Sequence, residues 1–147
     1  MHKYLSEKLK CDVMSDFGKL MQEKCMNFSI RVVNLCRFLN EEKHEYNMAN
    51  QLFRSGTSIG ANYSESQSAI SKRDFISKVY ISSKECSESL YWLELLFRTK
   101  YITEQQYNSI NADCLELKKM LTSITKTSRE NELTPSSVDT CAATLKP

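Results

Sequence analysis

Paired carboxylates are the first candidates for chemistry in this chain. Glu85 and Glu88 are three residues apart, so a helix would place both on one face, where they could exchange protons or bind metal. Di-iron sites in helix bundles also use histidine, in Glu-x-x-His motifs on two helices. The only histidines are His2 and His44, and neither fits such a motif. We therefore predict no metal, no cofactor and no catalytic site.

Charged side chains are instead expected to pair with one another. Arg31 and Arg54 each stand close to an apolar stripe, where an arginine often binds a carboxylate such as Glu65. The other acidic candidates for surface pairing, within the chain or with a neighbouring subunit, are Glu85, Glu88 and Glu94, with Lys84 and Arg98 as partners.

Six cysteines stand at positions 11, 25, 36, 86, 114 and 141, without a CxxC pair. Zinc sites need ligands clustered at short spacing, and these positions lack it. Cys36, Cys86 and Cys114 fall on apolar stripes, where a free thiol behaves as a small hydrophobic side chain. We predict reduced, buried, structural thiols.

Residues 54–62 read RSGTSIGAN, which puts Gly56 and Gly60 inside a helical segment. Each interior glycine costs a helix about 1 kcal/mol relative to alanine, so a close neighbour is expected on that face. A phosphate loop would need a Lys-Ser/Thr end after a strand, and the segment has neither. We predict close helix packing with Ser82 and Ser83 opposite the glycines; an oligomer contact or ligand groove on this face is the alternative.

Basic residues gather in two places that could bind nucleic acid. Clusters of cations on one surface, with aromatic side chains for stacking, favour such binding. An ordinary solvated helix face is the alternative explanation for both groups. The candidates are Lys72, Arg73 and Lys78 in the first group, and Lys118, Lys119 and Lys126 in the second.

The segment around residues 90–101 is apolar on nearly all sides. A helix of that kind is buried on more than one side, and a bundle core needs only one. We therefore expect a subunit interface formed by Tyr91, Trp92, Leu95, Leu96 and Tyr101.

Four helical segments position these residues. Segments 24–39 and 45–68 are followed by two with capping boxes, in which Ser71 precedes Asp74 and Thr103 precedes Gln106. Apolar spacings alternate between three and four, which is typical of helices that cross at about 20°. Short connections predict an antiparallel, up-down-up-down four-helix bundle over residues 23–127. We expect a weakly ordered extension over residues 1–22, with Met14 or Met21 as alternative starts, and a disordered tail over residues 128–147.

The 147 residues are enough for one domain with its own core, and the net charge is only +2. No apolar run approaches the length of about 20 residues that a membrane span needs, and no signal-peptide core precedes the first segment. We expect a cytoplasmic protein without membrane partners.

The runs RSGTSIGANYSESQSAISKRDFISK, KECSESLYWLELLFRTKYI and MLTSITK closely resemble a bacterial family of four-helix-bundle proteins encoded in intervening sequences of 23S ribosomal RNA genes. The same fold family includes the accessory variability determinant of diversity-generating retroelements, a partner of reverse transcriptase. The resemblance covers about residues 21–127.

The resemblance implies a homopentamer without known enzymatic activity. Within residues 24–127 there are 14 Lys/Arg and 11 Asp/Glu, fewer cations than the basic retroelement branch would carry. We therefore expect a non-enzymatic, homo-oligomeric scaffold, with RNA or DNA as a candidate partner. The alternative function is that of a nucleic-acid-binding accessory factor for a retroelement reverse transcriptase.

Overall fold

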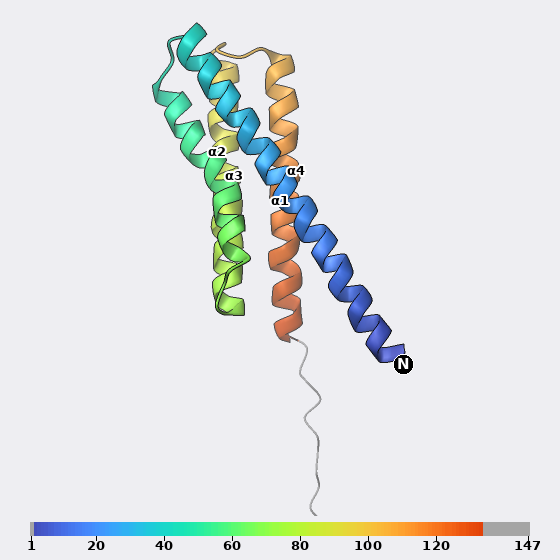
Figure 1. Cartoon of the computed structure of the whole chain (residues 1–147). Coiled ribbons are helices and arrows are strands. Elements are labelled where there is room, and N and C mark those ends of the chain that lie inside the picture. The colour runs from blue at the N-terminus through green and yellow to red at the C-terminus, as the bar shows by residue number, and fades with distance from the viewer. Residues whose placement is uncertain (1, 134–147) are drawn as a thin grey trace, which may run out of the picture.

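The computed structural model describes residues 2–133, with side chains described for residues 16–130. This part of the chain forms four helices and no strand (Figure 1). Their bounds are α1 His2–Glu42, α2 Asn47–Ser66, α3 Lys72–Arg98 and α4 Glu104–Leu133. The predicted all-α fold is confirmed.

Each of the last three helices begins at a side chain that accepts backbone N–H groups. Ser71 Oγ accepts the Asp74 N–H at 3.0 Å, as predicted. Thr103 and Gln106 form a reciprocal capping box, with the two hydrogen bonds at 3.2 and 2.9 Å. At α2, the carboxylate of Glu45 accepts the N–H groups of the three residues 47–49, at 3.1, 3.1 and 2.9 Å. The sequence analysis missed this third cap.

The core forms along one stripe of each helix. Buried positions recur every three or four residues, which keeps them on one face of a helix with 3.6 residues per turn. The largest fully buried side chains are Met21, Phe28, Val32 and Leu39 of α1, Leu52 and Ile59 of α2, Val79, Cys86, Leu93 and Leu96 of α3, and Leu117 and Leu121 of α4.

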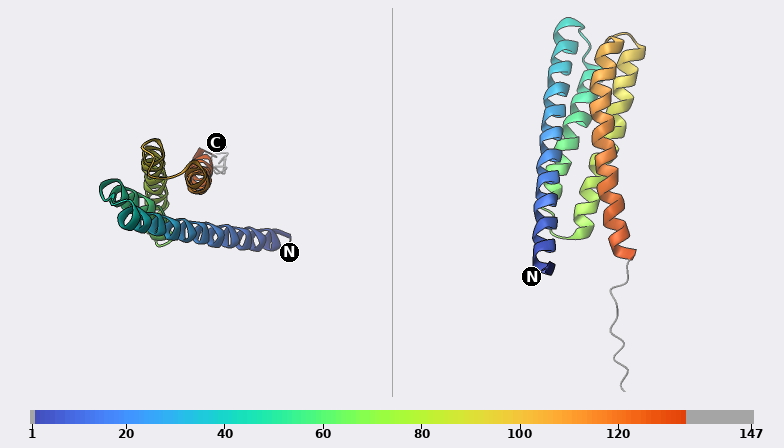
Figure 2. Two further views of the ribbon diagram at one scale, coloured as in Figure 1. Left: turned by 90° about the horizontal axis from the view of Figure 1, so that it is seen from above. Right: turned by 90° about the vertical axis from the view of Figure 1, so that its right-hand side faces the viewer.

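Each helix packs against its neighbours in the sequence, and α1 also contacts α4. The contact between α1 and α4 closes the antiparallel up-down-up-down bundle that the short connections predicted. The seam between α1 and α4 is bridged by polar groups: Arg31 binds Asp113 at 2.5 Å, and Lys24 binds Glu116 at 2.9 Å. Seen from above, the N-terminal half of α1 points away from the other three helices (Figure 2).

Both terminal helices continue beyond the predicted bundle boundaries at residues 23 and 127. α1 begins at His2 and passes through Gly18 without a break, and the weak order expected over residues 1–22 stays a prediction. A single glycine costs a helix about 1 kcal/mol, which is too little to interrupt one of this length. α4 continues to Leu133, beyond the expected boundary at residue 127. The rest of the predicted tail, residues 134–147, lies outside the described residues.

Candidate interaction surfaces

The two glycines of α2 face α1. A Cβ atom built on Gly56 would lie 2.8 and 2.9 Å from the two Cγ atoms of Val32, closer than atoms in contact allow. A Cβ atom on Gly60 would lie 3.3 Å from Cys25 Cβ and 3.5 Å from Ser29 Oγ. The predicted close approach is therefore present, but the expected partner was wrong. Packed side chains of α1, not Ser82 and Ser83, lie against the glycines.

Serines line the contact between α2 and α3 instead. The buried Ser82 Oγ donates a hydrogen bond to the Ile59 carbonyl at 2.7 Å. One heptad further on, Ser89 Oγ and Ser55 Oγ are hydrogen-bonded at 3.0 Å, both buried. Ser83 lies beside this row, half-buried. The sequence analysis missed Ser89, although its seven-residue spacing from Ser82 on the apolar stripe points to the same face.

Four free thiols lie in the core, three of them at the positions predicted to be buried and structural. Cys36 Sγ contacts the Ala49 carbonyl at 3.2 Å, and Cys114 Sγ contacts the Cys86 carbonyl at 3.5 Å. Burial raises the pKa of Cys25 to about 12 and that of Cys36 to about 11. These thiols stay protonated near neutral pH and act as packing groups.

The charged residues pair as expected in kind, and the expected pairing of Glu94 with Arg98 is present, but the other acidic candidates have partners that were not predicted. Arg54 binds Glu88 and lies 3.7 Å from Glu85, which joins α2 to α3. Lys78 binds Glu65 at 2.6 Å, so Glu65 is not the partner of Arg31 or Arg54. On the outside of α3, Arg98 binds Glu94 at 2.5 Å. Within residues 16–130, no group of three or more acidic, cysteine or histidine side chains is placed to hold a metal ion.

The outer face of α3 carries exposed apolar groups near its C-terminal end. Tyr91 is 59% exposed, and its ring meets that of Trp92 edge-on at 5.1 Å between centroids. Trp92 and Leu95 are half-buried, and a hollow of about 260 Å³ is lined by Tyr91, Glu94, Leu95 and Arg98. We call Tyr91, Trp92 and Leu95 the α3 apolar face.

Two of the five predicted interface residues lie elsewhere. Leu96 has no exposed surface, because it belongs to the stripe that faces the core. Tyr101 is half-buried against the core at the end of the bundle, where it lines a hollow of about 380 Å³ with Phe38 and Lys43. An all-round apolar segment does not reveal which of its sides the core covers, so the sequence could not separate these residues.

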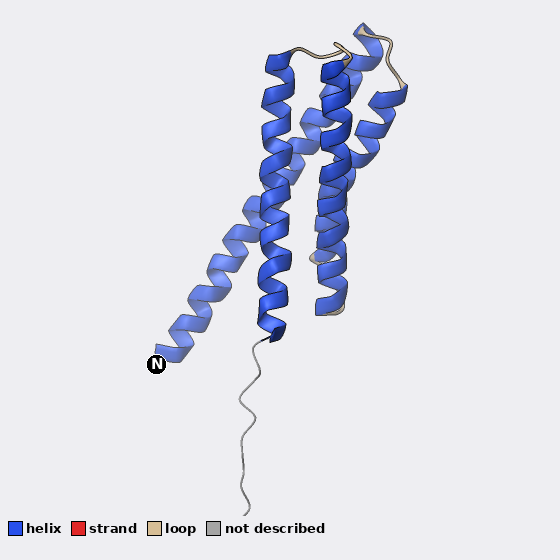
Figure 3. Cartoon of the chain, turned by 180° about the vertical axis from the view of Figure 1, so that it is seen from behind, coloured by secondary structure: helices blue, strands red, loops and turns tan. Residues whose placement is uncertain are grey.

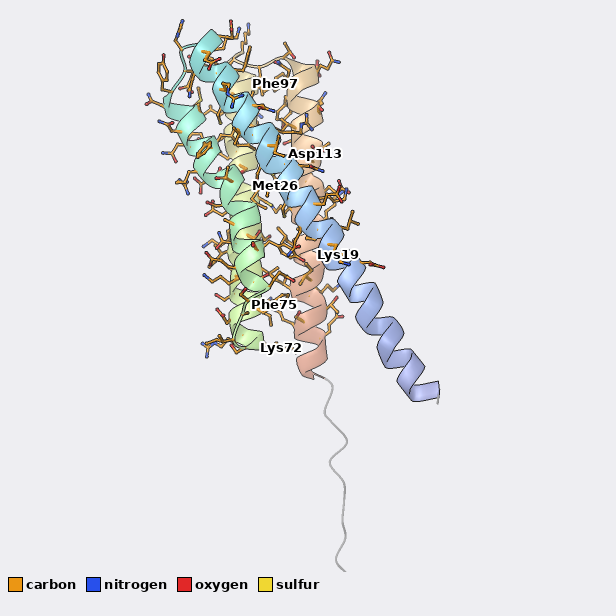
Figure 4. All side chains as sticks on the ribbon, viewed as in Figure 1. Lys19, Met26, Lys72, Phe75, Phe97 and Asp113 are labelled. Carbon is orange, nitrogen blue, oxygen red and sulfur yellow. The ribbon has the colours of Figure 1, made fainter. Side chains whose placement is uncertain are left out.

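Three exposed large hydrophobic residues that the sequence analysis missed lie on α1 and α2: Met26 and Ile30 on α1 and Phe53 on α2. Met26 lies on the part of α1 that crosses the bundle (Figure 4). We call these three residues the α1–α2 apolar patch.

The basic candidates divide between two sides of α3. Lys78 points toward α2, where it binds Glu65. Lys72 and Arg73 open α3, and Figure 4, in which Lys72 is labelled, shows that α3 begins at the end of the bundle where α4 ends. Lys119 and Lys126 are exposed on α4, and Lys118 is half-buried. Lys72, Arg73 and Lys126 thus lie toward one end of the bundle, whereas Lys118 and Lys119 lie near its middle, within about a turn of the level of Cys86.

These packed helices match a known family. The model of the family described as "23S rRNA-intervening sequence protein" matches residues 20–123. The chain belongs to this family. It is similar to a solved structure, a protein of unknown function from the S23 ribosomal protein family of Bacteroides thetaiotaomicron, with 50% identity and a TM-score of 0.74. That similarity covers 75% of this chain and 98% of the other. No curated protein matches the chain.

The family match follows the packed core. It begins one residue before Met21, the first buried residue of α1, and ends two residues after Leu121, the last of α4. Residues 2–19 of α1, which include the part that points away from the bundle, lie outside the match. Within residues 2–133, no helix is both long enough and apolar enough to cross a membrane.

Proposed function

We propose that this 23S rRNA-intervening sequence protein is a non-enzymatic scaffold that self-associates in the cytoplasm and binds RNA. The observation that carries self-association is the α3 apolar face, because a tyrosine 59% exposed lies there beside a tryptophan and a leucine. Aromatic side chains of this kind are enriched at the centres of protein interfaces.

Two separate apolar surfaces support a closed ring. A ring such as a homopentamer uses a heterologous interface, in which each subunit presents two different surfaces to its two neighbours. The α3 apolar face and the α1–α2 apolar patch provide two such surfaces. α1 and α3 stand at diagonally opposite corners of the bundle, since each packs against α2 and α4. One copy can therefore be contacted on both sides at once.

Light scattering coupled to size-exclusion chromatography tests self-association. We expect an oligomer for the wild type and a smaller mass for Tyr91→Glu and for Met26→Glu, one variant on each surface. Ile70→Glu is the matched control, because Ile70 is 96% exposed in a connection and the substitution is chemically the same. A monomeric wild type, or unchanged masses for both surface variants with helical content preserved, would contradict the proposal.

RNA binding is supported by the cations that α3 and α4 carry along the half of the bundle in which α3 begins and α4 ends. The absorbance ratio and nuclease sensitivity of material that co-purifies with the protein test it directly. RNA in the purified oligomer would support the proposal, and an oligomer free of nucleic acid that also fails to bind added RNA would refute this half of it.

The alternative, an accessory factor of a retroelement reverse transcriptase, is less well supported by the small net charge of +2. Genomic position separates the two. A gene within ribosomal RNA supports the first function, and a gene beside a reverse transcriptase with repeat cassettes supports the second.

A further inference from the structure

Positive charge is concentrated on one stretch of α4. Residues 118–129 read KKMLTSITKTSR, with four cations and no acidic residue. Lys119, Lys126 and Arg129 are exposed. None of these four cations forms an ion pair with another side chain in the part of the chain whose side chains are described. This stretch of α4 therefore presents to solvent positive charges that no ion pair with the described side chains neutralises.

A second row lies on α3. Arg73, Tyr80 and Lys84 are spaced by seven and four residues, which places them in one line along the helix. Tyr80 is 52% exposed, and Lys84 Nζ lies 6.0 Å from the centre of its ring. The α2 side of the helix is occupied by other residues, including Lys78 and Glu88 in their ion pairs. The row therefore faces away from α2.

We call the four cations of α4 the α4 row, and this row and the α3 row lie on neighbouring antiparallel helices. Contacts between Cys114 and Cys86, and between the stacked rings of Phe97 and Tyr107, fix the antiparallel register of α3 and α4. Cys114 lies beside Cys86, so Lys118, one turn further along α4, lies about one turn nearer the start of α3, and the rest of the α4 row lies beside the N-terminal half of α3. Figure 3 turns these two helices toward the viewer, in front of α1.

Three acidic side chains near this surface have contacts on other sides of their helices. Glu85 faces Arg54 on α2, and Glu116 binds Lys24 on α1. Asp74 accepts the Ile70 N–H at the start of α3. Glu130, four residues after Lys126 on the same face of α4, is exposed and forms no ion pair with a residue whose side chain is described. The cations thus keep their charge available for an anionic partner.

We propose that single-stranded RNA binds across this α3–α4 basic face, with its phosphates on the cations and a base stacked on Tyr80. The face consists of Arg73, Tyr80 and Lys84 of α3 and Lys118, Lys119, Lys126 and Arg129 of α4. The proposal rests on the RNA-binding half of the proposed function and assigns it to a surface and a strand type.

An exposed tyrosine between cations distinguishes a single strand from other anionic partners. Cationic grooves with aromatic side chains are the means by which proteins hold single strands, since every base offers a flat face for stacking. In a duplex the bases are already stacked on each other, so Tyr80 would have nothing to stack on. The α4 row spans about 16 Å at 1.5 Å per residue, enough for a few nucleotides.

Fluorescence anisotropy with a labelled single-stranded RNA of about 15 nucleotides tests the proposal over a range of salt concentrations. Each phosphate contact contributes about 0.7 to the slope of log affinity against log salt. Lys119→Gln/Lys126→Gln is expected to lower that slope by about 1.4. Arg37→Gln/Lys43→Gln removes the same charge from the far end of α1 and the connection after it, and is expected to change neither affinity nor slope.

Tyr80 provides a readout that charge alone would not give. Tyr80→Ala is expected to weaken binding roughly 5- to 150-fold with the salt slope unchanged, because stacking carries about 1–3 kcal/mol per base. Tyr80→Phe keeps the ring and is expected to bind like the wild type. Both substitutions are at a half-exposed position, so circular dichroism should show the same helical content.

Three outcomes would overturn the assignment: equal losses in the Arg37/Lys43 control, no effect of the Lys119/Lys126 and Tyr80 variants, or binding of duplex RNA as tight as that of the single strand. Single-stranded DNA bound as tightly as RNA would overturn the choice of RNA. If RNA binds but these variants have no effect, only the location is wrong. If no RNA binds at all, the RNA-binding half of the proposed function also fails.

Discussion

Gly56→Ala tests the packing of α2 against α1 with the smallest change available. The added Cβ atom would lie 2.8 Å and 2.9 Å from the two methyl groups of Val32, and 3.3 Å from its Cβ. Val32 has no exposed surface, and a β-branched side chain in a helix has one strongly preferred rotamer. Val32 therefore cannot turn away, and α1 must shift to admit the methyl group.

The expected magnitude is the difference between two opposing effects. Alanine in place of an interior glycine favours the helix by about 1 kcal/mol. Overpacking a well-packed core by a methyl group typically costs about 1–3 kcal/mol. We expect Gly56→Ala to lower the free energy of unfolding by up to about 2 kcal/mol, although the same change would stabilise an isolated helix.

The other two glycines provide graded controls. At Gly18 the nearest atom to the added Cβ is Tyr63 Oη at 4.0 Å, so Gly18→Ala should increase stability by about 0.5–1 kcal/mol. At Gly60 the nearest atom is Cys25 Cβ at 3.3 Å, a slightly tight contact with an atom close to the backbone. There the gain in helix propensity and the cost of the contact should nearly cancel.

Urea unfolding followed by circular dichroism measures the three free energies, at one protein concentration because self-association would shift the midpoint. Val32→Ala should cost less in the Gly56→Ala background than in the wild type, with a coupling of about 0.5–3 kcal/mol. If Gly56→Ala is as stable as Gly18→Ala, the close approach of Val32 does not limit the packing and the reasoning is refuted.

Three other predictions rest on single contacts. Glu45→Ala should lower the free energy of unfolding in urea by about 1–2 kcal/mol, because the Glu45 side chain, 8% exposed, caps three N–H groups of α2. Glu45→Gln should retain part of that cap. Arg54→Gln should cost more than Arg98→Gln, because Glu85 keeps a buried oxygen without a hydrogen bond and would lose the cation that lies 3.7 Å from it, whereas the Arg98–Glu94 pair is exposed. Equal costs in urea unfolding would contradict this. Burial raises the pKa of Cys25 from 9.0 to about 12, so the thiol loses its proton at a lower pH in the unfolded chain, and stability should fall as the pH rises from about 9 toward 12. A urea midpoint that stays constant between pH 8 and pH 10.5 would contradict this prediction, and Cys25→Ala should make stability depend less steeply on pH.

Features set by local sequence were predictable. Ser71 and Thr103 cap their helices because serine and threonine oxygens reach the N–H groups three residues on, whatever the rest of the fold does. The alternation of three- and four-residue spacings gave the core stripes for the same reason. Glu45 was missed because glutamate is not among the favoured N-cap residues, and only the tertiary structure buries it at that position.

The sequence did not predict which neighbouring helix each residue of a helix would face. Gly56 and Ser55 are adjacent in sequence and about 100° apart around the helix, so one faces α1 and the other faces α3. The sequence shows that small residues gather there, but not which helix each one meets. Leu95 and Leu96 present the same problem on α3, where one is half-buried on the outer face and the other lies in the core.

The two proposed surfaces can be separated experimentally, because they occupy different levels of α3. Tyr80 and Tyr91 are eleven residues apart, about 16 Å along the helix. A Tyr91→Glu variant that no longer self-associates therefore keeps an intact α3–α4 basic face. It should bind a short RNA as the wild-type subunit does, with the same salt slope.

A long RNA should distinguish the wild-type oligomer from the Tyr91→Glu variant. An oligomer can hold one strand on several basic faces, and linked binding of this kind can raise the overall affinity about 10²–10⁴-fold without any new contact. The Tyr91→Glu variant should lose that gain, while Tyr80→Ala should weaken short and long RNAs alike. If Tyr91→Glu weakens binding of the short RNA as much as that of the long one, the contact surface includes residues from two subunits, and the single-subunit face proposed above is incomplete.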